Sequence, residues 1–234
     1  ATPSAESRKR VARIIAGTHG GRTIAVPSKG TRPTTDRVRE ALFARLDHYD
    51  LIDDAAVLDL FAGSGALGIE ASSRGAARVV LVEADRRAAQ VCRDNVARLG
   101  MANVTVTQQK VESYLASAAG GAGQGFDLVF VDPPYDLGEG ELTAGLTALV
   151  DHLGADAVVV VERSARSPEP ALPPGLNLWE TRRYGETALH LLDRRASHGP
   201  SDDASDADGV AEGVADGDDA DATASLTPPA ASQA

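Results

Sequence analysis

The sequence predicts an α/β fold, with a doubly wound and mostly parallel sheet that carries helices on both faces. From Ala55 onward, short apolar runs alternate with stretches of helical periodicity. Strands that are apolar along their whole length are typical of parallel sheets buried on both faces. The glycine-rich segment Gly63–Gly68 directly follows the first apolar run. Doubly wound sheets bind ligands at a turn of this kind, so the segment supports the same fold class.

The residue pattern places each expected element. Strands are expected at Val57–Phe61, Val79–Val82, Val104–Thr107, Leu128–Val131, Val158–Val161 and Leu189–Leu192. Helices are expected near residues 66–74, 86–99, 111–118 and 140–152, and an irregular loop is expected at Pro168–Gly175.

Charge and composition predict three regions. Residues 1–50 carry ten Lys and Arg against five Asp and Glu, so we expect a basic extension with a hairpin over 11–26 and an amphipathic helix over 34–46. Such a segment can bind phosphates although the whole chain has a net charge of -11. Residues 51–195 form the expected catalytic domain. Residues 196–234 hold nine acids and no Lys or Arg, and we expect a disordered tail.

Composition also excludes several classes of protein. No apolar run approaches the roughly 18 to 20 residues that span a bilayer, and no secretory signal is visible, so we expect a cytoplasmic protein. The single cysteine, Cys92, excludes an internal disulfide and a multi-thiolate metal site, and we expect a small buried side chain there. We expect no metal and no membrane partner. A monomer is the simpler expectation for the oligomeric state.

The segment Asp59–Gly68 has the features of a nucleoside-cofactor site. Gly63 and Gly65 let the backbone pass close to a ligand, and the N-terminus of the next helix favours a negative group. Glu83, at the end of the next strand, is placed to accept hydrogen bonds from two ribose hydroxyls. We expect cofactor contacts from Asp59, Phe61, Ala62, Gly63, Ser64, Gly65 and Glu83.

Three cofactor types have to be weighed for this segment. The spacing of Gly63, Gly65 and Gly68 also satisfies the dinucleotide pattern of NAD enzymes. Asp59 favours another cofactor, because a carboxylate beside the loop repels a pyrophosphate but suits the ammonium group of a methionine moiety. The tract lacks the Gly-Lys-Ser/Thr ending of a P-loop, which argues against ATP or GTP hydrolysis. The pattern therefore favours S-adenosylmethionine.

A second motif, Asp132-Pro133-Pro134-Tyr135, follows another apolar run. Two prolines restrict the backbone, which would hold the Asp132 carboxylate, the Pro133 carbonyl and the Tyr135 ring in one arrangement. Two such acceptors can bind the N–H groups of a nucleobase amine while the ring stacks on the base. In isolation the motif is more often a strand ending in a proline turn. Together with the cofactor segment it predicts methyl transfer to nitrogen, with Asp59, Glu83 and Asp132 at one crevice.

These residues resemble those of the S-adenosylmethionine-dependent methyltransferases of class I, which have a Rossmann-like fold. More narrowly, residues 11–195 resemble the bacterial ribosomal RNA small-subunit methyltransferase D family, which methylates N2 of a guanine in 16S rRNA. The resemblance rests on Arg13–Gly17, Arg32–Glu40, Asp59–Glu70, Asp132–Tyr135 and Tyr184–Thr187. The segment Arg32–Glu40 is the most specific of these.

The resemblance implies a seven-stranded sheet with the last strand antiparallel, and an N-terminal extension that contacts RNA. Asp132, Pro133, Pro134 and Tyr135 would be catalytic, and 16S rRNA within a 30S subunit or assembly intermediate would be the substrate. Gln108–Val111 departs from the usual adenine-binding pattern, so we assign the adenine contact to the backbone of Lys110 and Val111. We expect substrate contacts from Arg10, Arg13, Arg32, Thr34, Thr35, Arg37, Arg39, Tyr184 and Glu186.

Three alternatives stay open at the level of sequence. An N6-adenine methyltransferase acting on DNA would use the same Asp132–Tyr135 turn, although the chain has no sizeable domain for reading DNA sequence. An RNA-binding assembly factor without activity would keep the fold, but the intact set of Asp59, Glu83 and Asp132 argues for catalysis. A hydride-transferring NAD enzyme is the least favoured.

Overall fold

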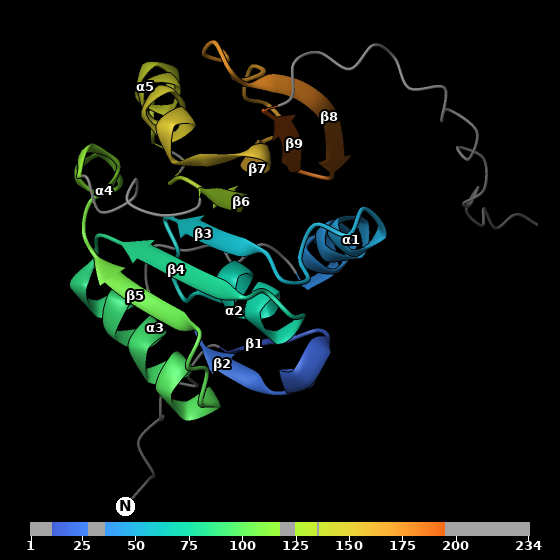
Figure 1. Cartoon of the computed structure of the whole chain (residues 1–234), viewed down its shortest axis with the longest axis vertical. Helices are drawn as coiled ribbons and strands as arrows, with labels where there is room; N and C mark the ends of the chain where they lie inside the picture. The colour runs from blue at the N-terminus through green and yellow to red at the C-terminus, as the bar shows by residue number, and fades with distance from the viewer. Residues whose placement is uncertain (1–10, 28–35, 118–124, 135, 195–234) are drawn as a thin grey trace, which may run out of the picture. The chain divides into compact units, whose positions relative to one another are not determined.

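The computed structural model describes residues 11–27, 36–117, 125–134 and 136–194. The larger sheet has seven strands in the order β5-β4-β3-β6-β7-β9-β8 (Figure 1). Its strands are β3 (Ala56–Leu60), β4 (Arg78–Glu83), β5 (Val104–Gln108), β6 (Phe126–Val131), β7 (Leu153–Ser164), β8 (Asn177–Tyr184) and β9 (Thr187–Asp193). The helices are α1 (Asp36–His48), α2 (Ala66–Ser73), α3 (Arg86–Leu99), α4 (Val111–Ala116) and α5 (Glu139–Leu149). Strands β1 (Val11–Arg13) and β2 (Thr23–Ala25) form a separate antiparallel hairpin.

The sheet is mostly parallel, as the sequence predicts. Strands β5, β4, β3, β6 and β7 pair in parallel, whereas β9 is antiparallel to both of its neighbours, β7 and β8. The doubly wound fold with an antiparallel last strand is therefore confirmed. The six strands expected from periodicity do not include β8. It is an edge strand rich in charged and exposed residues, so it lacks the apolar run by which the other strands are found.

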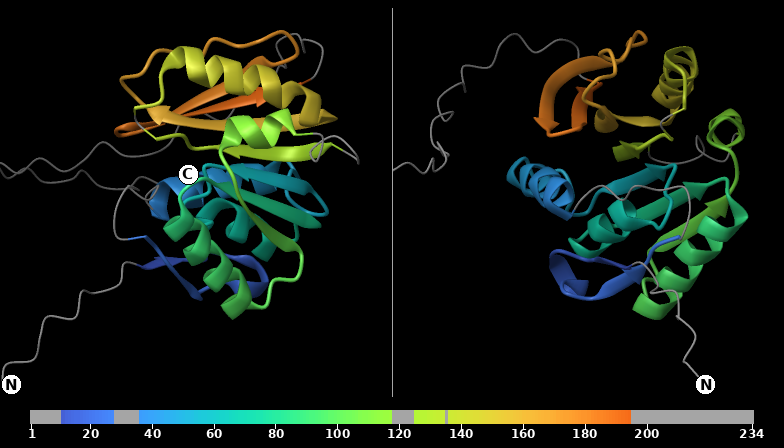
Figure 2. Two further views of the ribbon diagram at one scale, coloured as in Figure 1. Left: turned by 90° about the vertical axis from the view of Figure 1, so that its left-hand side faces the viewer. Right: turned by 180° about the vertical axis from the view of Figure 1, so that it is seen from behind.

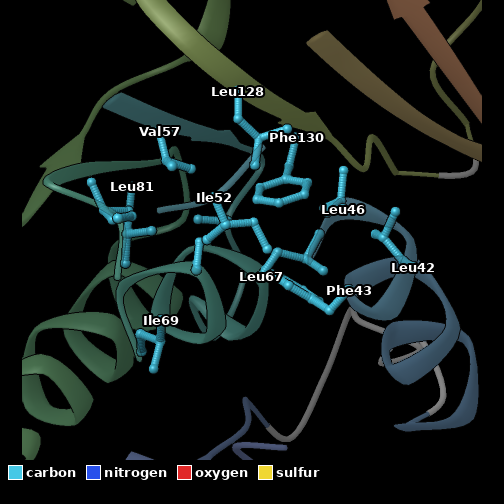
Figure 3. Close-up of a cluster of buried hydrophobic side chains, with 14 of the residues drawn as sticks. Leu42, Phe43, Leu46, Ile52, Val57, Leu67, Ile69, Leu81, Leu128 and Phe130 are labelled. Carbon is cyan, nitrogen blue, oxygen red and sulfur yellow. The ribbon is translucent and has the colours of Figure 1, made fainter. Parts of the chain in front are cut away.

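Two hydrophobic clusters cover the two faces of the sheet. One contains side chains of α1, α2, α3 and the hairpin, and the other contains side chains of α4 and α5. Figure 2 shows α4 and α5 on the side of the sheet away from α1 and α2. In the first cluster, Phe43 of α1 packs against Phe130 of β6 with ring centroids 5.7 Å apart (Figure 3). Cys92 lies in this cluster and is fully buried, as expected.

Helix α1 buries one residue that the sequence predicts to contact the substrate. Arg39 is 1% exposed and donates hydrogen bonds to the carbonyl of Arg13 and to Asp36. Its position is explained by helical spacing, because Arg39 precedes the buried Leu42 and Phe43 by three and four residues. The prediction that Arg39 contacts RNA phosphates is therefore wrong. Arg37 on the same helix is exposed, and its predicted contact stays a prediction.

A buried carboxylate joins the N-terminal hairpin to α2. Glu70 is 0% exposed and accepts hydrogen bonds from the backbone N–H groups of Ile15 (2.7 Å) and Ala16 (3.0 Å). The same carboxylate forms an ion pair with Arg74 one turn later, at 2.8 Å. Gly17 follows with φ 78°, and any Cβ there would lie 1.8 Å from the carbonyl oxygen of Ser73. This close approach requires glycine and fixes the hairpin on the end of α2.

Asn95 of α3 makes a second junction, between the hairpin and the loop that follows β3. Its side chain is 1% exposed, accepts a hydrogen bond from the Ala25 N–H and donates to the Ala25 carbonyl, both at 2.9 Å. It also donates to the carbonyl of Ser64 at 3.1 Å. One buried amide therefore connects the extension to the predicted cofactor loop. Within the described part of the chain, no helix combines the length and apolar character needed to cross a membrane.

Replacing Glu70 with Gln should lower the free energy of unfolding by about 3 kcal/mol, because it breaks a buried ion pair and sets an amide N–H group against a backbone donor. Urea denaturation followed by circular dichroism measures the change. Glu112→Gln, at an exposed position of α4, is the matched control and should stay within about 0.5 kcal/mol of the parent. Equal losses in the two variants would contradict the assigned role of Glu70.

Candidate active site

The carboxyl ends of the five parallel strands form one edge of the sheet, and their register sets the site. Leu60 of β3 pairs with Val82 of β4 and with Val131 of β6. The next residue on each strand is therefore Phe61, Glu83 or Asp132, in a common row. Strand spacing of about 4.8 Å puts the backbones of Glu83 and Asp132 roughly 10 Å apart, on either side of Phe61. The predicted convergence of these two acids at one edge of the sheet follows from this register.

The loop after β3 turns sharply through left-handed backbone conformations. Phe61, Gly63 and Gly65 have φ values of 63°, 57° and 80°. A positive φ at an aromatic residue is costly, and such strain is concentrated at functional sites. A Cβ at Gly65 would also lie 2.9 Å from the end of the Leu81 side chain, so a larger residue would force Leu81 to shift. The loop has a fixed shape that brings backbone groups to the row of Glu83 and Asp132.

Glu83 holds this loop in place. One oxygen of its carboxylate accepts the Gly63 N–H at 2.7 Å, and the other accepts the Asp85 N–H at 2.7 Å. A carboxylate has two lone pairs on each oxygen, so both oxygens retain capacity for further donors. The side chain is half-buried at the end of β4. Its contact with two ribose hydroxyls stays a prediction, and its position at the strand end is compatible with that contact.

Asp59 lies deeper than the sequence suggests. Its side chain is 1% exposed, and it accepts the Gly68 N–H at 2.9 Å. Gly68 is the third residue of α2, so Asp59 caps this helix from the neighbouring strand. The carboxylate therefore supports the loop from below, and its contact with a ligand ammonium stays a prediction. Burial raises the pKa of Asp59 to about 7; the Gly68 hydrogen bond opposes this rise and the charge of Glu83 adds to it.

The other predicted cofactor residues are close to this loop in the chain and in the sheet. Ala62 and Ser64 are buried, and the carbonyl of Ser64 is bound by Asn95. Lys110 is exposed and directly precedes α4, which begins at Val111. Because Glu83 pairs with Gln108 on β5, Lys110 and Val111 follow the strand that ends next to Glu83. Their contacts with a cofactor stay predictions.

Asp132 and Pro133 line a small cavity that also involves the ends of β7 and β9. The remaining lining residues are Glu162, Arg163, Ser164, Ser167, Glu186 and Thr187. Since Val131 pairs with Val161, Glu162 occupies the same row as Asp132 on the adjacent strand. Alternation along a strand places these two residues on the same face of the sheet. The site thus contains a second carboxylate beside Asp132.

Arg163 binds the segment that follows the Asp132 turn. Arg163 is 9% exposed, forms an ion pair with Glu139 of α5 and donates a hydrogen bond to the carbonyl of Leu137 at 3.3 Å. The N–H of Leu137 in turn donates to the carbonyl of Pro134 at 3.0 Å. The carbonyl of Glu186 accepts the Ala165 N–H at 2.8 Å, which joins the β8–β9 turn to the end of β7. Arg163 therefore connects the end of β7 to the segment after the Asp132 turn, and the Glu186 carbonyl fixes the neighbouring β8–β9 turn.

Sequence reasoning missed Glu162 and Arg163. Both lie at the end of an apolar run, and the signal that could have found them is the shared carboxyl edge of parallel strands. Glu186 lines the same cavity as Asp132, whereas Tyr184 lines a different groove, between α1 and β8, and the predicted substrate contacts of both residues stay predictions. Arg13 is exposed on β1. Five predicted site residues lie outside the described part of the chain: Arg10, Arg32, Thr34, Thr35 and Tyr135.

The donor set of the site suits an organic cofactor. Among the described residues, no group of His, Cys, Asp and Glu side chains is arranged to hold a metal ion. The half-buried Glu83 and the backbone of a strained loop are suited to hydroxyl and ammonium groups of a nucleoside ligand. The residues present therefore fit an adenosine-containing cofactor.

Comparisons with known proteins agree with this geometry. A family model described as "Conserved hypothetical protein 95" matches residues 12–193. The chain is 42% identical over 191 residues to ribosomal RNA small subunit methyltransferase D of Escherichia coli (strain K12), across 81% of this chain and 93% of that protein. It is 34% identical to the putative rRNA methyltransferase YlbH of Bacillus subtilis (strain 168), across 78% of this chain and 99% of that protein. A solved structure of the putative methyltransferase yhhF from Escherichia coli has a TM-score of 0.70 and 40% identity, covering 80% of this chain and all 100% of that one.

Asp59→Asn should stabilise the protein increasingly as the pH rises from 5 to 8. The folded-state pKa of about 7 lies above the ordinary value of 3.8, so burying the charged form costs free energy that grows through this window. A neutral amide avoids that cost, which reaches at most about 4 kcal/mol. Urea denaturation of both proteins at each pH measures the difference. A difference that stays constant from pH 5 to 8 would contradict the raised pKa.

Proposed function

This chain belongs to the ribosomal RNA small subunit methyltransferase D family, and on that premise we propose that it methylates the exocyclic N2 amine of a guanine in 16S rRNA, with S-adenosylmethionine as the donor. The observation that carries the proposal is the row of Glu83, Phe61 and Asp132 at one edge of the sheet. In this row Glu83, the proposed cofactor-binding acid, and Asp132, the proposed base-binding acid, lie on either side of one loop. The 30S subunit or an assembly intermediate is the proposed form of the substrate, which places the enzyme in the cytoplasm.

Three parts of the chain would hold the cofactor. The backbone of the loop from Phe61 to Gly65 would contact the methionine moiety, Glu83 would accept hydrogen bonds from the ribose hydroxyls, and the Lys110–Val111 backbone would contact adenine. When bound, S-adenosylmethionine supplies a methyl group on a positively charged sulfur. Asp59 supports this arrangement indirectly, because its hydrogen bond to Gly68 fixes the helix end beneath the loop.

Asp132 and the carbonyl of Pro133 would bind the two N–H groups of the guanine amine. The lone pair of this nitrogen is delocalised into the purine ring, so the amine is a poor nucleophile. Two acceptors that bind both hydrogens draw the nitrogen toward tetrahedral geometry. This change makes its lone pair available for attack on the methyl group. The carboxylate also stabilises the positive charge that develops on nitrogen and can take the proton afterwards. Tyr135 would stack on the base, which must first leave its RNA stack.

Glu162 supports guanine rather than adenine as the target base. The edge of guanine next to its 2-amino group carries an N1–H donor, whereas the corresponding N1 of adenine is an acceptor. A carboxylate is only an acceptor when ionised, so it binds the N1–H of guanine and repels the N1 of adenine. Glu162 lines the cavity beside Asp132 and occupies the same row of the sheet. We therefore assign it to recognition of guanine N1–H.

The overall proposal is tested by incubating unmodified 30S particles, free 16S rRNA and duplex DNA with labelled S-adenosylmethionine, followed by nucleoside analysis. We expect N2-methylguanosine from the ribosomal substrates. Label found only as N6-methyladenine in DNA would overturn the assignment of substrate and base.

Asp132→Ala should retain S-adenosylmethionine binding and reduce turnover by about 100- to 1000-fold, as expected for the loss of one group that stabilises the transition state. Calorimetric titration measures cofactor affinity, and single-turnover methylation of 30S particles measures the rate. Asp151→Ala, at an exposed position, should behave like the parent. Turnover of Asp132→Ala close to that of the parent would refute the role of Asp132.

Glu162→Gln should change the preferred base at the methylated position. A 16S rRNA built by ligation can carry either guanine or 2,6-diaminopurine there, and the latter keeps the 2-amino group but has an acceptor at N1. The parent enzyme should prefer guanine, and Glu162→Gln should shift this preference by about 10-fold or more toward diaminopurine, because its amide donates to N1. Asp156→Asn, exposed on the same strand, is the control. An unchanged ratio of kcat/KM values in Glu162→Gln would remove Glu162 from base recognition.

A further inference from the structure

We propose that the groove between α1 and β8 binds a single strand of the ribosomal RNA beside the methylated guanine. The groove has a volume of about 470 Å³, and its lining includes Arg45, His48, Arg182, Arg183 and Tyr184. Figure 1 shows α1 and β8 as neighbours, although they are far apart in the sequence. This inference rests on the proposed function for the identity of the RNA. It extends the proposed RNA contact from the basic segment of residues 1–50, which supplies α1, to strand β8.

The groove is basic in a chain whose net charge is -11. Glu180 is half-buried and pairs with Arg45 from α1 and with Arg182 from its own strand, each at 2.5 Å through Nε. A guanidinium has five N–H donors, so these ion pairs restrict the two side chains and leave donors for a second acceptor. Arg183 and His48 are exposed beside them. Three arginines around one acid give a local positive charge that suits the phosphates of RNA.

Two exposed aromatic rings lie next to these charges. Tyr49 and Trp179 are each 37% exposed, and their ring centroids are 4.6 Å apart. Arg45 lies 4.9 Å from the centroid of the Tyr49 ring and donates a hydrogen bond to its hydroxyl at 2.8 Å. Trp179 is at an irregularity in the pairing of β8 with β9. Exposed aromatics beside arginines are the features with which proteins bind unpaired bases, by stacking and by phosphate contacts.

The linings of the groove and of the Asp132 cavity lie close together along the chain, at the β8–β9 turn. Tyr184, the last residue of β8, lines the groove, whereas Glu186 and Thr187 line the cavity that contains Asp132. Four consecutive residues, Tyr184–Thr187, thus connect the groove to the cavity. An RNA strand that occupies the groove would approach the proposed site of methylation along them. Stacking needs bases that are not paired, which favours a single strand over a duplex. The occupant that fits is single-stranded RNA flanking the extruded guanine.

Trp179 is the single tryptophan of the chain, so its fluorescence reports on the aromatic pair beside the groove. Titration of the full chain with a short single-stranded RNA should quench this fluorescence, and the affinity should fall as salt is raised. The double variant Arg182→Glu and Arg183→Glu should weaken RNA binding by about 10-fold or more. Arg183→Glu alone leaves both ion pairs of Glu180 intact and should weaken it less. The matched control is Arg86→Glu with Arg87→Glu, an exposed arginine pair on α3, which should stay within about twofold of the parent.

The outcomes separate this inference from the proposed function. If the parent methylates 30S particles but RNA leaves Trp179 fluorescence unchanged and the double variant binds 30S particles like the parent, the groove assignment is overturned and the methyltransferase assignment stands. If RNA quenches Trp179 and the double variant loses affinity while the parent methylates no RNA, the groove stands and the proposed function fails. A midpoint temperature of thermal unfolding equal to that of the parent shows that a variant is folded. Stronger binding of duplex DNA than of single-stranded RNA would also overturn the inference.

Discussion

The parallel register of β4, β3, β6 and β7 is the constraint on which the site depends. Because residues alternate between the two faces of a strand, a slip of one residue would move a side chain to the opposite face. The observed register sets Glu83, Phe61, Asp132 and Glu162 in one row across these strands. The acids come from segments that are separated by up to 79 positions in the chain. Only the pairing of strands brings them to one edge.

The loop beside this row is fixed by buried contacts that reach it from several elements. Glu83 binds the Gly63 N–H, and the Cys92 thiol donates to the Gly63 carbonyl at 3.1 Å. Asn95 binds the carbonyl of Ser64, and Asp59 caps the helix that follows. A loop that is held before the ligand arrives needs to lose less conformational entropy on binding. The positive φ of Phe61 is maintained by these contacts rather than by its own preference.

Much of the fold could be predicted because the buried strands are apolar along their length. The limits of such reasoning are visible at particular residues. Strand β8 has exposed and charged side chains, so periodicity gives no signal for it, although its exposed Trp179 becomes informative once α1 is seen beside it. Arg39 is charged but follows the helical spacing of buried residues, and tertiary packing overrides its polarity. Burial depth is likewise invisible in the sequence, so the motif predicts a cofactor contact for Asp59 but not that its side chain is 1% exposed.

The candidate site could be predicted in its motifs but not in its supporting residues. Glycine spacing and the Asp132-Pro133-Pro134 turn each carry a local chemical meaning, so one segment suffices to recognise them. Glu162 has no motif of its own, and it becomes part of the site only through its register with Asp132. Arg163 is similar, since its contacts with Leu137 and Glu139 depend on how α5 packs.

The buried carboxylate of Glu70 has a consequence for how this protein can be divided. The hairpin supplies two backbone donors to that carboxylate and several side chains to the larger hydrophobic cluster. A truncation that begins at residue 51 would remove these donors and these apolar side chains. The charged carboxylate of Glu70 would then remain in the interior with one hydrogen-bond partner fewer on each oxygen. The basic extension is therefore part of the folding unit, and the smallest fragment that we expect to fold cooperatively includes it. Fusing the catalytic part alone to another RNA-binding domain would lower the stability of the protein before it changed its specificity.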